Sequence, residues 1–413
     1  MKTKKKNRKK KIVLKILIVI LLALVLYAGF ITYKAVKLGG GLQGFVAATM
    51  GHDETTLKNM PKIRCLLIGK SQELTDTIIV AEYNPQKQEA VMMSIPRDTF
   101  VGKDKTKATG MNKINALYQV SPEKLIKAVN DITGLEIEKY ITVDTKALRE
   151  LVDAIGGVTF YVPTDMDYDD DSQKLHIKLK EGEQLLNGDK AEQLVRFRKN
   201  NNGTGYPAEW GRDDYGRMRT QREFIMAALK QTLQAKNILK LGELIDIANR
   251  NIETNMDISQ IKDYLPYIIN FNTENIVTGA LPGQSELIEK TDGTSIWVFV
   301  HNKKQSEKLI GELFLNKPTK EELEENSKIN IQLLYIESKE EAVNKLEKDL
   351  KDQGYKITKE EIESAPKTII INRKQMEEKQ LQNIKSYVAN GITEDGEDVG
   401  EYNCTIIIGK DYE

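Results

Sequence analysis

The stretch KYITVDTKALRELVDAIGGVTFYV, residues 139–162, decides the fold class. It opens with the β-branched run Lys139–Val143 and closes with a second such run, Val158–Val162. Between them apolar residues recur at the spacing of one helix face, and Gly156-Gly157 supplies a helix end. The apolar positions of that face are Leu148, Leu151, Val152 and Ile155. A strand, a helix and a strand in succession predict an α/β domain.

Upstream of this stretch, three short apolar runs follow one another closely and predict strands. They are Ile63–Gly69, Thr77–Tyr83 and Glu89–Ile95, with a turn at Asn84-Pro85. Connections this short fit hairpins, so we expect a mixed sheet rather than an all-parallel one. A helix follows at Ser121-Pro122-Glu123, where serine caps and proline takes the first helical position.

Downstream, the pattern predicts a helix over Gln221–Gln234 and a strand over Ile296–Val300. Residues 317–328 are charged and predict a linker or a capping helix. From Ile329 strand and helix patterns alternate again to the end of the chain. We therefore predict a large α/β domain over 61–316, a linker over 317–328 and a small α/β domain over 329–413.

The N-terminal region has the pattern of a membrane anchor. Residues 1–11 hold eight basic side chains and no acid, and residues 12–33 are nearly all apolar. About 20 apolar residues span a bilayer as a helix, and basic flanks favour the cytoplasm. A signal peptide is the alternative, but its short apolar region and small-residue cleavage site are not evident. We expect a cytoplasmic tail, a single-pass transmembrane helix, a stalk over 34–60 and localisation in the cell membrane with the bulk outside.

The formal net charge of zero is unevenly divided along the chain. Residues 1–37 carry eleven basic and no acidic side chains, so the remainder carries 50 basic against 61 acidic ones. A remainder that is acidic overall does not suggest nucleic-acid binding. Cys65 and Cys404 fall in different predicted domains, so no disulfide is expected. The three histidines are isolated and show no metal-ligand spacing.

Arginine is scarce, yet it is concentrated in one segment. Twelve of the 61 basic residues are arginine, and six of these twelve fall within 196–222: Arg196, Arg198, Arg212, Arg217, Arg219 and Arg222. The planar guanidinium binds phosphate or carboxylate oxygens two at a time, which lysine cannot do. The cluster therefore indicates a multiply charged oxyanion such as pyrophosphate. A helix surface covered by salt bridges is the alternative.

Other polar groups stand at predicted strand ends, where α/β sheets bind ligands. They are Asp76, the pair Arg97-Asp98 and Lys113. Arg196 and Arg198 are two residues apart and would point the same way in an extended strand. Arg217 and Gln221 are four apart and would share a helix face. Each also has a purely structural interpretation: Asp76 as a turn cap, Arg97-Asp98 as a surface ion pair, and the two arginines as flanks of a buried Phe197.

Residues Asp165–Asp171, DMDYDDD, resemble a calcium-binding loop. They lack the glycine and the terminal glutamate of an EF-hand. A solvated acidic loop is the interpretation that we favour.

Taken together, these stretches resemble the LytR-CpsA-Psr family of bacterial cell-envelope proteins. The resemblance rests on SIPRDT (94–99), KINALY (113–118), the run from Asp165 to Arg198 and DDYGRMRTQ (213–221). Members transfer anionic glycopolymers, such as wall teichoic acid or capsular polysaccharide, from an undecaprenyl-pyrophosphate donor to peptidoglycan. The family fold encloses a hydrophobic tunnel for the lipid. The last 85 residues resemble a C-terminal domain found on many members.

The resemblance also implies roles for individual residues. Asp76 matches an acidic position that binds Mg²⁺ (or Mn²⁺) or acts as a base. Arg97, Arg196 and Arg198 match the pyrophosphate-binding arginines, and Arg97 and Arg198 are also expected to be catalytic. The remaining head-group positions match Lys113, Asp214, Arg217 and Gln221.

The chain departs from the family pattern beside Asp76. A second acidic position is Ser71, and two positions that are commonly arginine are Glu73 and Leu74. Asp213 or Glu73 is a possible substitute ligand. A non-catalytic protein that binds or scaffolds polyprenyl-pyrophosphate glycans is therefore the alternative to a phosphotransferase. A transcriptional role is disfavoured because an eleven-residue tail cannot form a DNA-binding fold.

Overall fold

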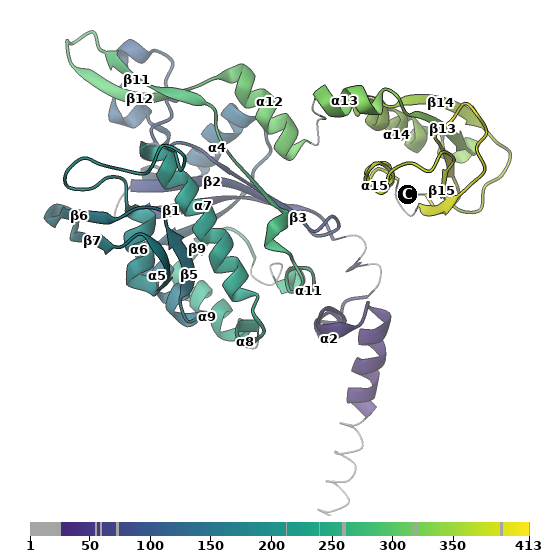
Figure 1. Ribbon diagram of the computed structural model, residues 1–413, viewed down its shortest axis with the longest axis horizontal. Helices are drawn as coiled ribbons and strands as arrows, with labels where there is room; N and C mark the ends of the chain where they lie inside the picture. Colours follow the sequence, from purple (N-terminus) through teal and green to yellow (C-terminus); the bar gives the residue numbers. More distant parts are fainter. Residues whose placement is uncertain are drawn as a thin grey trace, which may run out of the picture. The chain divides into compact units, whose positions relative to one another are not determined.

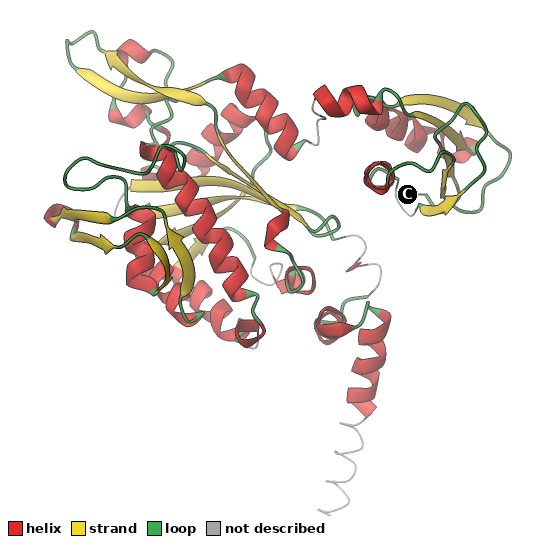
Figure 2. Ribbon diagram, viewed as in Figure 1, coloured by secondary structure: helices red, strands yellow, loops and turns green. Residues whose placement is uncertain are grey.

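The computed structural model describes residues 26–53, 56–57, 60–71, 74–211, 213–238, 240–257, 262–315, 318, 320–388 and 391–412. The chain divides into two compact units, Met1–Ser306 and Glu307–Glu413. Figures 1 and 2 show a large α/β unit built around a twisted sheet and a smaller α/β unit at the C-terminal end of the chain.

The first unit is organised by a six-stranded sheet with the order β10-β3-β2-β1-β4-β9. These strands are β1 (Ile63–Ser71), β2 (Leu74–Asn84), β3 (Glu89–Ser94), β4 (Lys139–Asp144), β9 (Ile252–Thr254) and β10 (Ile276–Ala280). Strand β2 pairs antiparallel with both β1 and β3, whereas β1–β4 and β3–β10 are parallel pairs. The predicted mixed α/β fold is confirmed.

The sheet is stable because its central strands are buried. Leu66, Ile68, Ile79 and Val80 are at most 2% exposed, as the continuous apolar runs of β1 and β2 require. Cys65 lies in β1 and is a free thiol, as predicted, and burial raises its pKa to about 12.

Local sequence signals fix the helices beside the sheet. Ser121 accepts a hydrogen bond from the Lys124 amide and caps α4 (Pro122–Thr133), which ends at the left-handed Gly134. Asp144 closes β4 and caps α5 (Thr145–Ala154) in the same way. Asp144 thus ends a strand and begins a helix, and it also lines a cavity beside the sheet.

Helices α6 (Gly188–Arg196), α7 (Asp213–Thr232) and α9 (Leu241–Asn251) complete this side of the unit. Figure 1 shows α7 running across the sheet, with α5, α6 and α9 grouped beside it. Their shared core includes Val152, Phe160, Leu194, Phe197 and Phe224. Two antiparallel strand pairs pack on the same core: β5–β8 (Val158–Val162 with Gly182–Leu186) and the hairpin β6–β7 (Met166–Asp170 with Leu175–Leu179), which lies between β5 and β8 in the sequence.

A further two-stranded ribbon is formed by β11 (Gly283–Glu289) and β12 (Ser295–His301). Backbone hydrogen bonds of 2.8 Å join it to the loop after β3: the Phe299 amide donates to the Asp98 carbonyl, and the Phe100 amide donates to the Phe299 carbonyl. The ribbon is therefore held directly beside Arg97-Asp98.

The second unit has its own sheet and its own core. The strand order is β14-β13-β17-β15-β16, from Lys356–Glu361, Asn330–Tyr335, Cys404–Ile408, Ile369–Asn372 and Ile392–Asp395. Helix α14 (Glu340–Asp352) buries Val343, Leu346 and Leu350 in this core. The predicted linker contains the helix α13 (Lys320–Asn326), and the domain boundaries at 316 and 329 stay predictions.

At the N-terminal end, residues 26–37 are helical, and α2 (Gly41–Thr49) lies within the predicted stalk. Across the described part of the chain, no helix combines the length and apolar character that membrane crossing requires. This finding overturns the predicted localisation as a single-pass membrane protein. The predicted tail, residues 1–11, and residues 12–25 of the predicted span lie outside the described residues.

Candidate active site

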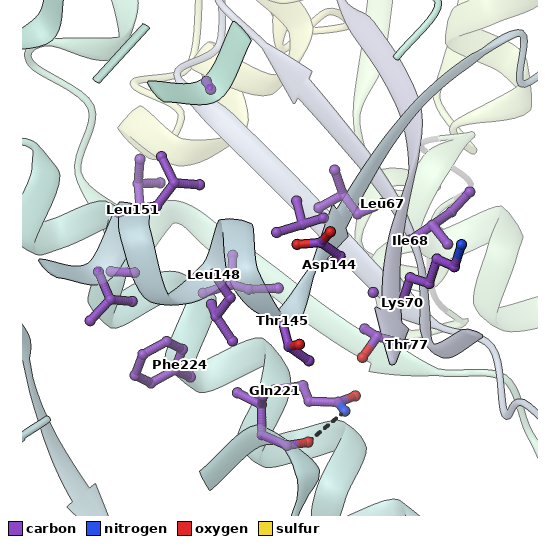
Figure 3. A pocket seen from close by; sticks show the side chains of 18 of the residues that line it. Leu67, Ile68, Lys70, Thr77, Asp144, Thr145, Leu148, Leu151, Gln221 and Phe224 are labelled. Atoms are coloured by element: carbon purple, nitrogen blue, oxygen red, sulfur yellow. Dashed lines mark hydrogen bonds between the residues drawn. The ribbon is translucent and has the colours of Figure 1, made fainter. Parts of the chain in front are cut away.

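A cavity of about 520 Å³ lies between the sheet and helices α5, α7 and α9. Its walls are mainly aliphatic and aromatic side chains. They include Leu148, Leu151 and Val152 of α5, Phe224, Ile225 and Leu229 of α7, and Leu244 and Ile245 of α9. Figure 3 shows Leu151 and Phe224 on one side of this cavity and Lys70 and Thr77 on the other. The space therefore has an apolar end and a polar end.

The polar end is formed where strands of the sheet terminate. Asp76 and Thr77 of β2, Ser71 of β1 and Asp144 at the end of β4 line the cavity. Arg196 and Gln221 complete the polar end from α6 and α7. Three of the predicted site residues, Asp76, Arg196 and Gln221, thus line one cavity although 145 positions separate the first from the last.

Asp76 and Arg97 form the first of two ion pairs at this end. The Nη1 atom of Arg97 donates to Oδ1 of Asp76, and both side chains are about one-fifth exposed. Burial lowers the pKa of Arg97, but the carboxylates of Asp76, Asp214 and Asp98 outweigh this effect and raise it overall. The guanidinium is fully charged.

Asp214 and Arg217 form the second ion pair, one turn apart at the start of α7. Arg217 is only 4% exposed, and burial lowers its pKa. Its charge also interacts with Asp214, Arg97, Asp76 and Arg198. We call Asp76, Arg97, Asp214 and Arg217 the Asp–Arg cluster.

The start of α7 is fixed by a close packing contact. A Cβ on Gly216 would lie 2.3 Å from the Gly211 carbonyl oxygen and 2.5 Å from the Tyr206 ring. Glycine therefore allows the first turn of α7, with Asp214 and Arg217, to approach the loop before it. The Tyr206 ring in turn packs edge-on against the Phe197 ring, with the ring centroids 5.2 Å apart.

The predicted strand through Arg196 and Arg198 is wrong. Asn187 caps α6, whose buried Ala191 and Leu194 give it an amphipathic face, and the helix continues to Arg196 before Phe197 turns extended. Arg196 hydrogen-bonds Glu192 at 3.0 Å and Gln173 at 2.9 Å. The capped helix thus includes Arg196, in place of the extended strand that the spacing of Arg196 and Arg198 had suggested. Arg198 lies beyond the helix and is exposed.

Gln221 and Lys113 have defined partners as well. The Gln221 amide donates to the Val195 carbonyl at 3.0 Å, which joins α7 to α6 just before Arg196. Lys113 pairs with Asp98 at 2.9 Å, beside Arg97. Arg217 and Gln221 are both on α7, as their spacing predicted.

Several buried polar atoms of these residues have no hydrogen-bond partner within the described part of the chain. They are Nε of Arg97, Nε of Arg217 and Oε1 of Gln221. An unpaired buried donor loses hydration without compensation, so a ligand oxygen placed here would be stabilised. Two of the three atoms are arginine donors, which suit an anion.

Of the three departures from the family pattern, only Ser71 has a described side chain. Ser71 is buried and lines the cavity where an acid would otherwise stand. Glu73 and the side chains of Leu74 and Asp213 lie outside the described residues.

A metal ion is not indicated by the described side chains alone. Among them no group of three His, Cys, Asp or Glu residues is placed to hold a metal. Asp76 is bonded to Arg97. Mg²⁺ can, however, bind one or two carboxylates and take its other ligands from water and substrate phosphates.

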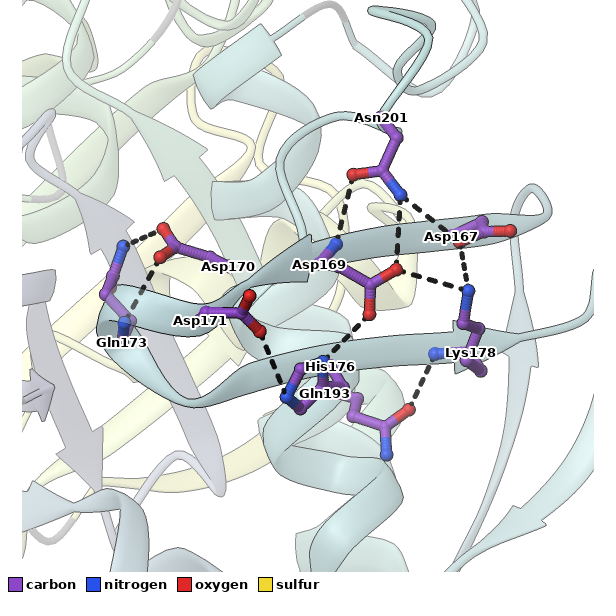
Figure 4. A network of polar contacts seen from close by, with 9 residues as sticks. All are labelled: Asp167, Asp169, Asp170, Asp171, Gln173, His176, Lys178, Gln193 and Asn201. Carbon is purple, nitrogen blue, oxygen red and sulfur yellow. Dashed lines mark hydrogen bonds and ion pairs between the residues drawn. The ribbon is translucent and has the colours of Figure 1, made fainter.

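The acidic segment Asp165–Asp171 is mostly strand rather than the predicted loop, whereas Asp165, Asp167 and Asp169 are exposed to solvent, as predicted. Residues Met166–Asp170 form β6, and Figure 4 shows their carboxylates bonded within the hairpin and to Asn201. Lys178 bonds Asp167 at 2.6 Å, and His176 lies 2.8 Å from Asp169. Hydrogen bonds from Ser172 and Gln173 lower the pKa of Asp170 to about 2. These carboxylates are therefore satisfied within the protein.

Sequence reasoning missed three residues near this site: Lys70, Asp144 and Arg222. Asp144 ends a parallel strand next to β1, a signal that strand-end reasoning could have used. Arg222 is 8% exposed and donates to Ser94 Oγ at 2.7 Å. It stood in the arginine segment, but nothing in the sequence separated it from the ligand-facing members.

Known proteins share this architecture and sequence. The chain is 27% identical to a polyisoprenyl-teichoic acid–peptidoglycan teichoic acid transferase TagU from Oceanobacillus iheyensis, over 62% of this chain and 76% of that protein. It is also 27% identical to the corresponding transferase TagV from Bacillus subtilis, over 63% and 68%. The crystal structure of B. subtilis TagV matches with a TM-score of 0.50 and 26% identity, covering 61% of this chain and 96% of that one.

A structure of protein gbs0355 from Streptococcus agalactiae shares the fold, with a TM-score of 0.51, 21% identity and coverage of 63% of this chain and 89% of that one. Residues 42–315 match the LytR_cpsA_psr family, a range that includes the cavity and the Asp–Arg cluster and stops before most of the second unit. The resemblance of the C-terminal residues to a family-associated domain therefore stays a prediction. The chain belongs to the LytR_cpsA_psr family.

Proposed function

We propose that this protein is a phosphotransferase that moves an anionic glycopolymer, of the teichoic acid or capsular type, from an undecaprenyl-pyrophosphate donor to peptidoglycan. One observation carries the proposal: a single cavity joins an apolar wall to a polar end beside the Asp–Arg cluster. A polyprenyl pyrophosphate has the matching division between hydrocarbon chain and charged head. The names of the relatives, teichoic acid transferases, support the same class of substrate.

The lipid of the donor would occupy the apolar part of the cavity. Leu148, Leu151 and Phe224 offer a surface without charge, and burial of hydrocarbon there is favourable by about 25 cal/mol per Å². The pyrophosphate would then reach Arg97, Arg196 and Arg198, with Lys113, Arg217 and Gln221 around it. Asp214 would hold Arg217 in place.

The reaction would break the phosphoanhydride bond of the donor and form a phosphodiester to the acceptor. An acceptor hydroxyl oxygen attacks the sugar-linked phosphorus, the bond from that phosphorus to the bridging oxygen breaks, and polyprenyl phosphate leaves. Arg97 and Arg198 would stabilise the charge that collects on the phosphate oxygens. Asp76 would accept the proton of the attacking hydroxyl once Arg97 has turned to the phosphate.

Mg²⁺ or Mn²⁺ held by Asp76 belongs to the proposal, with phosphate oxygens of the donor as further ligands. When bound, such an ion neutralises phosphate charge. Charge stabilisation and proton transfer are assigned to residues of the chain.

Asp76→Asn tests the assignment directly. The full-length protein is incubated with a polyprenyl-pyrophosphate-linked glycan, peptidoglycan fragments and Mg²⁺, and both polyprenyl phosphate and glycan joined to peptidoglycan are measured. We expect transfer to fall by about a hundredfold or more, as for loss of a general base. Donor affinity measured without added metal should hold or rise, because Arg97 loses its competing carboxylate. Unchanged transfer would remove Asp76 from the mechanism.

The non-catalytic alternative is favoured by one observation, the serine at position 71, which leaves Asp76 without a second acid there. In that case the wild type would bind donor tightly and release no polyprenyl phosphate. Ser71→Asp would then be expected to start turnover. An enzyme assayed with the wrong substrate would instead stay inactive in this variant as well.

A further inference from the structure

The β11–β12 ribbon has two chemically different faces. Strand residues alternate between faces, so Ile288, Ile296 and Val298 lie on one face and are partly or fully buried. The opposite face carries Leu287 and Trp297, which are 54% and 58% exposed. These two residues are direct cross-strand partners and form one apolar step on an otherwise polar surface.

This face leads to residues that neighbour the Asp–Arg cluster. Phe299 follows Trp297 on the same face by two residues, and it is buried against Tyr215 with ring centroids 6.3 Å apart. Tyr215 directly precedes Gly216 and follows Asp214 of the Asp–Arg cluster, and its hydroxyl reaches the Gly283 carbonyl at 3.3 Å. The backbone of Phe299 is bonded on both sides to the loop after Arg97. Trp297 therefore lies two residues along β12 from Phe299, which contacts residues next to the Asp–Arg cluster.

We propose that Trp297 and Leu287 form a stacking platform for a sugar ring of the peptidoglycan acceptor, a subsite that rests on the proposed function. A pyranose ring presents C–H bonds on its faces and hydroxyl groups at its edge. The platform matches this division, with an aromatic and an aliphatic side chain at its centre and Ser285, Glu289 and Ser295 exposed around them on the same face.

Size and charge favour this occupant over others. A stable protein interface buries about 800 Å² on each partner, far more than two side chains provide. The face contains one charged group, Glu289, and it is acidic. The anionic polymer of the donor would be repelled by this charge, whereas the sugar rings of the acceptor glycan strand are neutral.

The test compares binding and turnover in the full-length protein. The probe is a soluble peptidoglycan glycan strand, measured by calorimetry without donor, so that binding is scored even when no transfer occurs. Trp297→Ala should weaken glycan binding by about tenfold, and Trp297→Phe should retain most of it because an aromatic face remains. In the transfer assay the KM for the acceptor should rise in Trp297→Ala, while kcat and donor affinity stay unchanged.

A matched control uses a second exposed leucine. Leu185→Ala, at 59% exposure on β8, should leave glycan binding unchanged, whereas Leu287→Ala should weaken it. The proposal is overturned if Trp297→Ala binds the glycan strand as the wild type does. It is also overturned if this variant loses donor affinity instead, or changes only the oligomeric state in sedimentation. If the wild type binds the glycan strand but transfers no glycan, the proposed function is contradicted and the Trp297 subsite is not.

Discussion

Arg198 differs from the other arginines of the site because it is exposed. It is close enough to influence the pKa of Arg217, so it stands beside the Asp–Arg cluster. An exposed guanidinium can turn to a phosphate at little energetic cost, whereas Arg97 and Arg217 must first leave a carboxylate.

Arg198→Lys keeps the charge and loses the two-donor fork. We expect turnover or donor affinity to fall by about tenfold, since bidentate phosphate binding is lost. Steady-state kinetics with the lipid-linked donor measures it. Arg250→Lys, an exposed arginine on α9, serves as the control and should behave as the wild type. Equal kinetics in both variants would mean that charge alone explains the arginine segment.

Arg222 is a buried cation, and its Nη1 atom donates to Ser94 Oγ at the end of β3. Its Nε atom is buried without a hydrogen-bond partner among the described residues. Burial lowers its pKa to about 10, below the ordinary value. The unfolded chain therefore holds this proton more tightly, and at neutral pH the charge opposes folding. The bond links α7 to the strand that leads into Arg97.

Arg222→Met separates positioning from stability. Replacing a buried charge with an apolar side chain should leave the free energy of unfolding within about 1 kcal/mol of the wild type. Transfer should nevertheless fall several-fold, because α7 loses its bond to β3. Chemical unfolding and kcat are measured together, and Ser94→Ala should reproduce the kinetic effect. A large loss of stability with normal kcat would show Arg222 to be purely structural.

At the scale of elements, α7 contributes more of the candidate site residues than any other helix or strand, and its first turn depends on one glycine. Asp214, Arg217, Gln221 and Arg222 all belong to this helix. Gly216 lets that turn pack against Tyr206 and Gly211. Any shift of the first turn would move both members of the Asp214–Arg217 pair.

Gly216→Ala should therefore destabilise the fold by about 1–3 kcal/mol through overpacking and should lower donor affinity. Gly242→Ala is the matched control, since Gly242 also lies in a helix and its added Cβ would meet nothing within 4 Å. That variant should be slightly stabilised by better helix propensity. Thermal unfolding of the two proteins makes the comparison, and similar melting temperatures would contradict the packing argument.

Local signals predicted most elements near the site but not how they meet. The apolar runs at 63–69 and 77–83, the Ser121 cap and the Gly156-Gly157 stop each acted through neighbouring residues, so the sequence was sufficient for them. The extended backbone expected at Arg196 is absent because α6 continues to that residue. The start of α7 was placed eight residues too late, since its charged first turns are buried by tertiary contacts that periodicity does not reveal.

At the scale of the whole molecule, each of the two compact units has its own hydrophobic core within the described residues. The first includes Phe197 and Phe224 beside the cavity, and the second includes Ile331, Leu333 and Ile406. Every residue that lines the cavity belongs to the first unit. Stability of the second unit and binding at the cavity are therefore expected to vary independently.

Ile406→Ala tests this independence. Ile406 is fully buried in the second sheet, and truncation should destabilise that unit by about 2–4 kcal/mol. Hydrogen exchange should accelerate in residues 329–412 and remain unchanged in the sheet of the first unit. Binding of the lipid-linked donor should match that of the wild type. Weakened donor binding would instead show that the two units are thermodynamically coupled.

The internal pairing of the Asp–Arg cluster has a consequence for which solutes the protein admits. Arg97 and Arg217 each hold an aspartate through one Nη atom, so an arriving anion that binds these atoms competes with a carboxylate. Chloride, with one charge and no fork of oxygens, gains too little from this exchange. A pyrophosphate gains two bidentate contacts at once. We therefore expect the resting cluster to bind a multiply charged head group in preference to small monovalent anions.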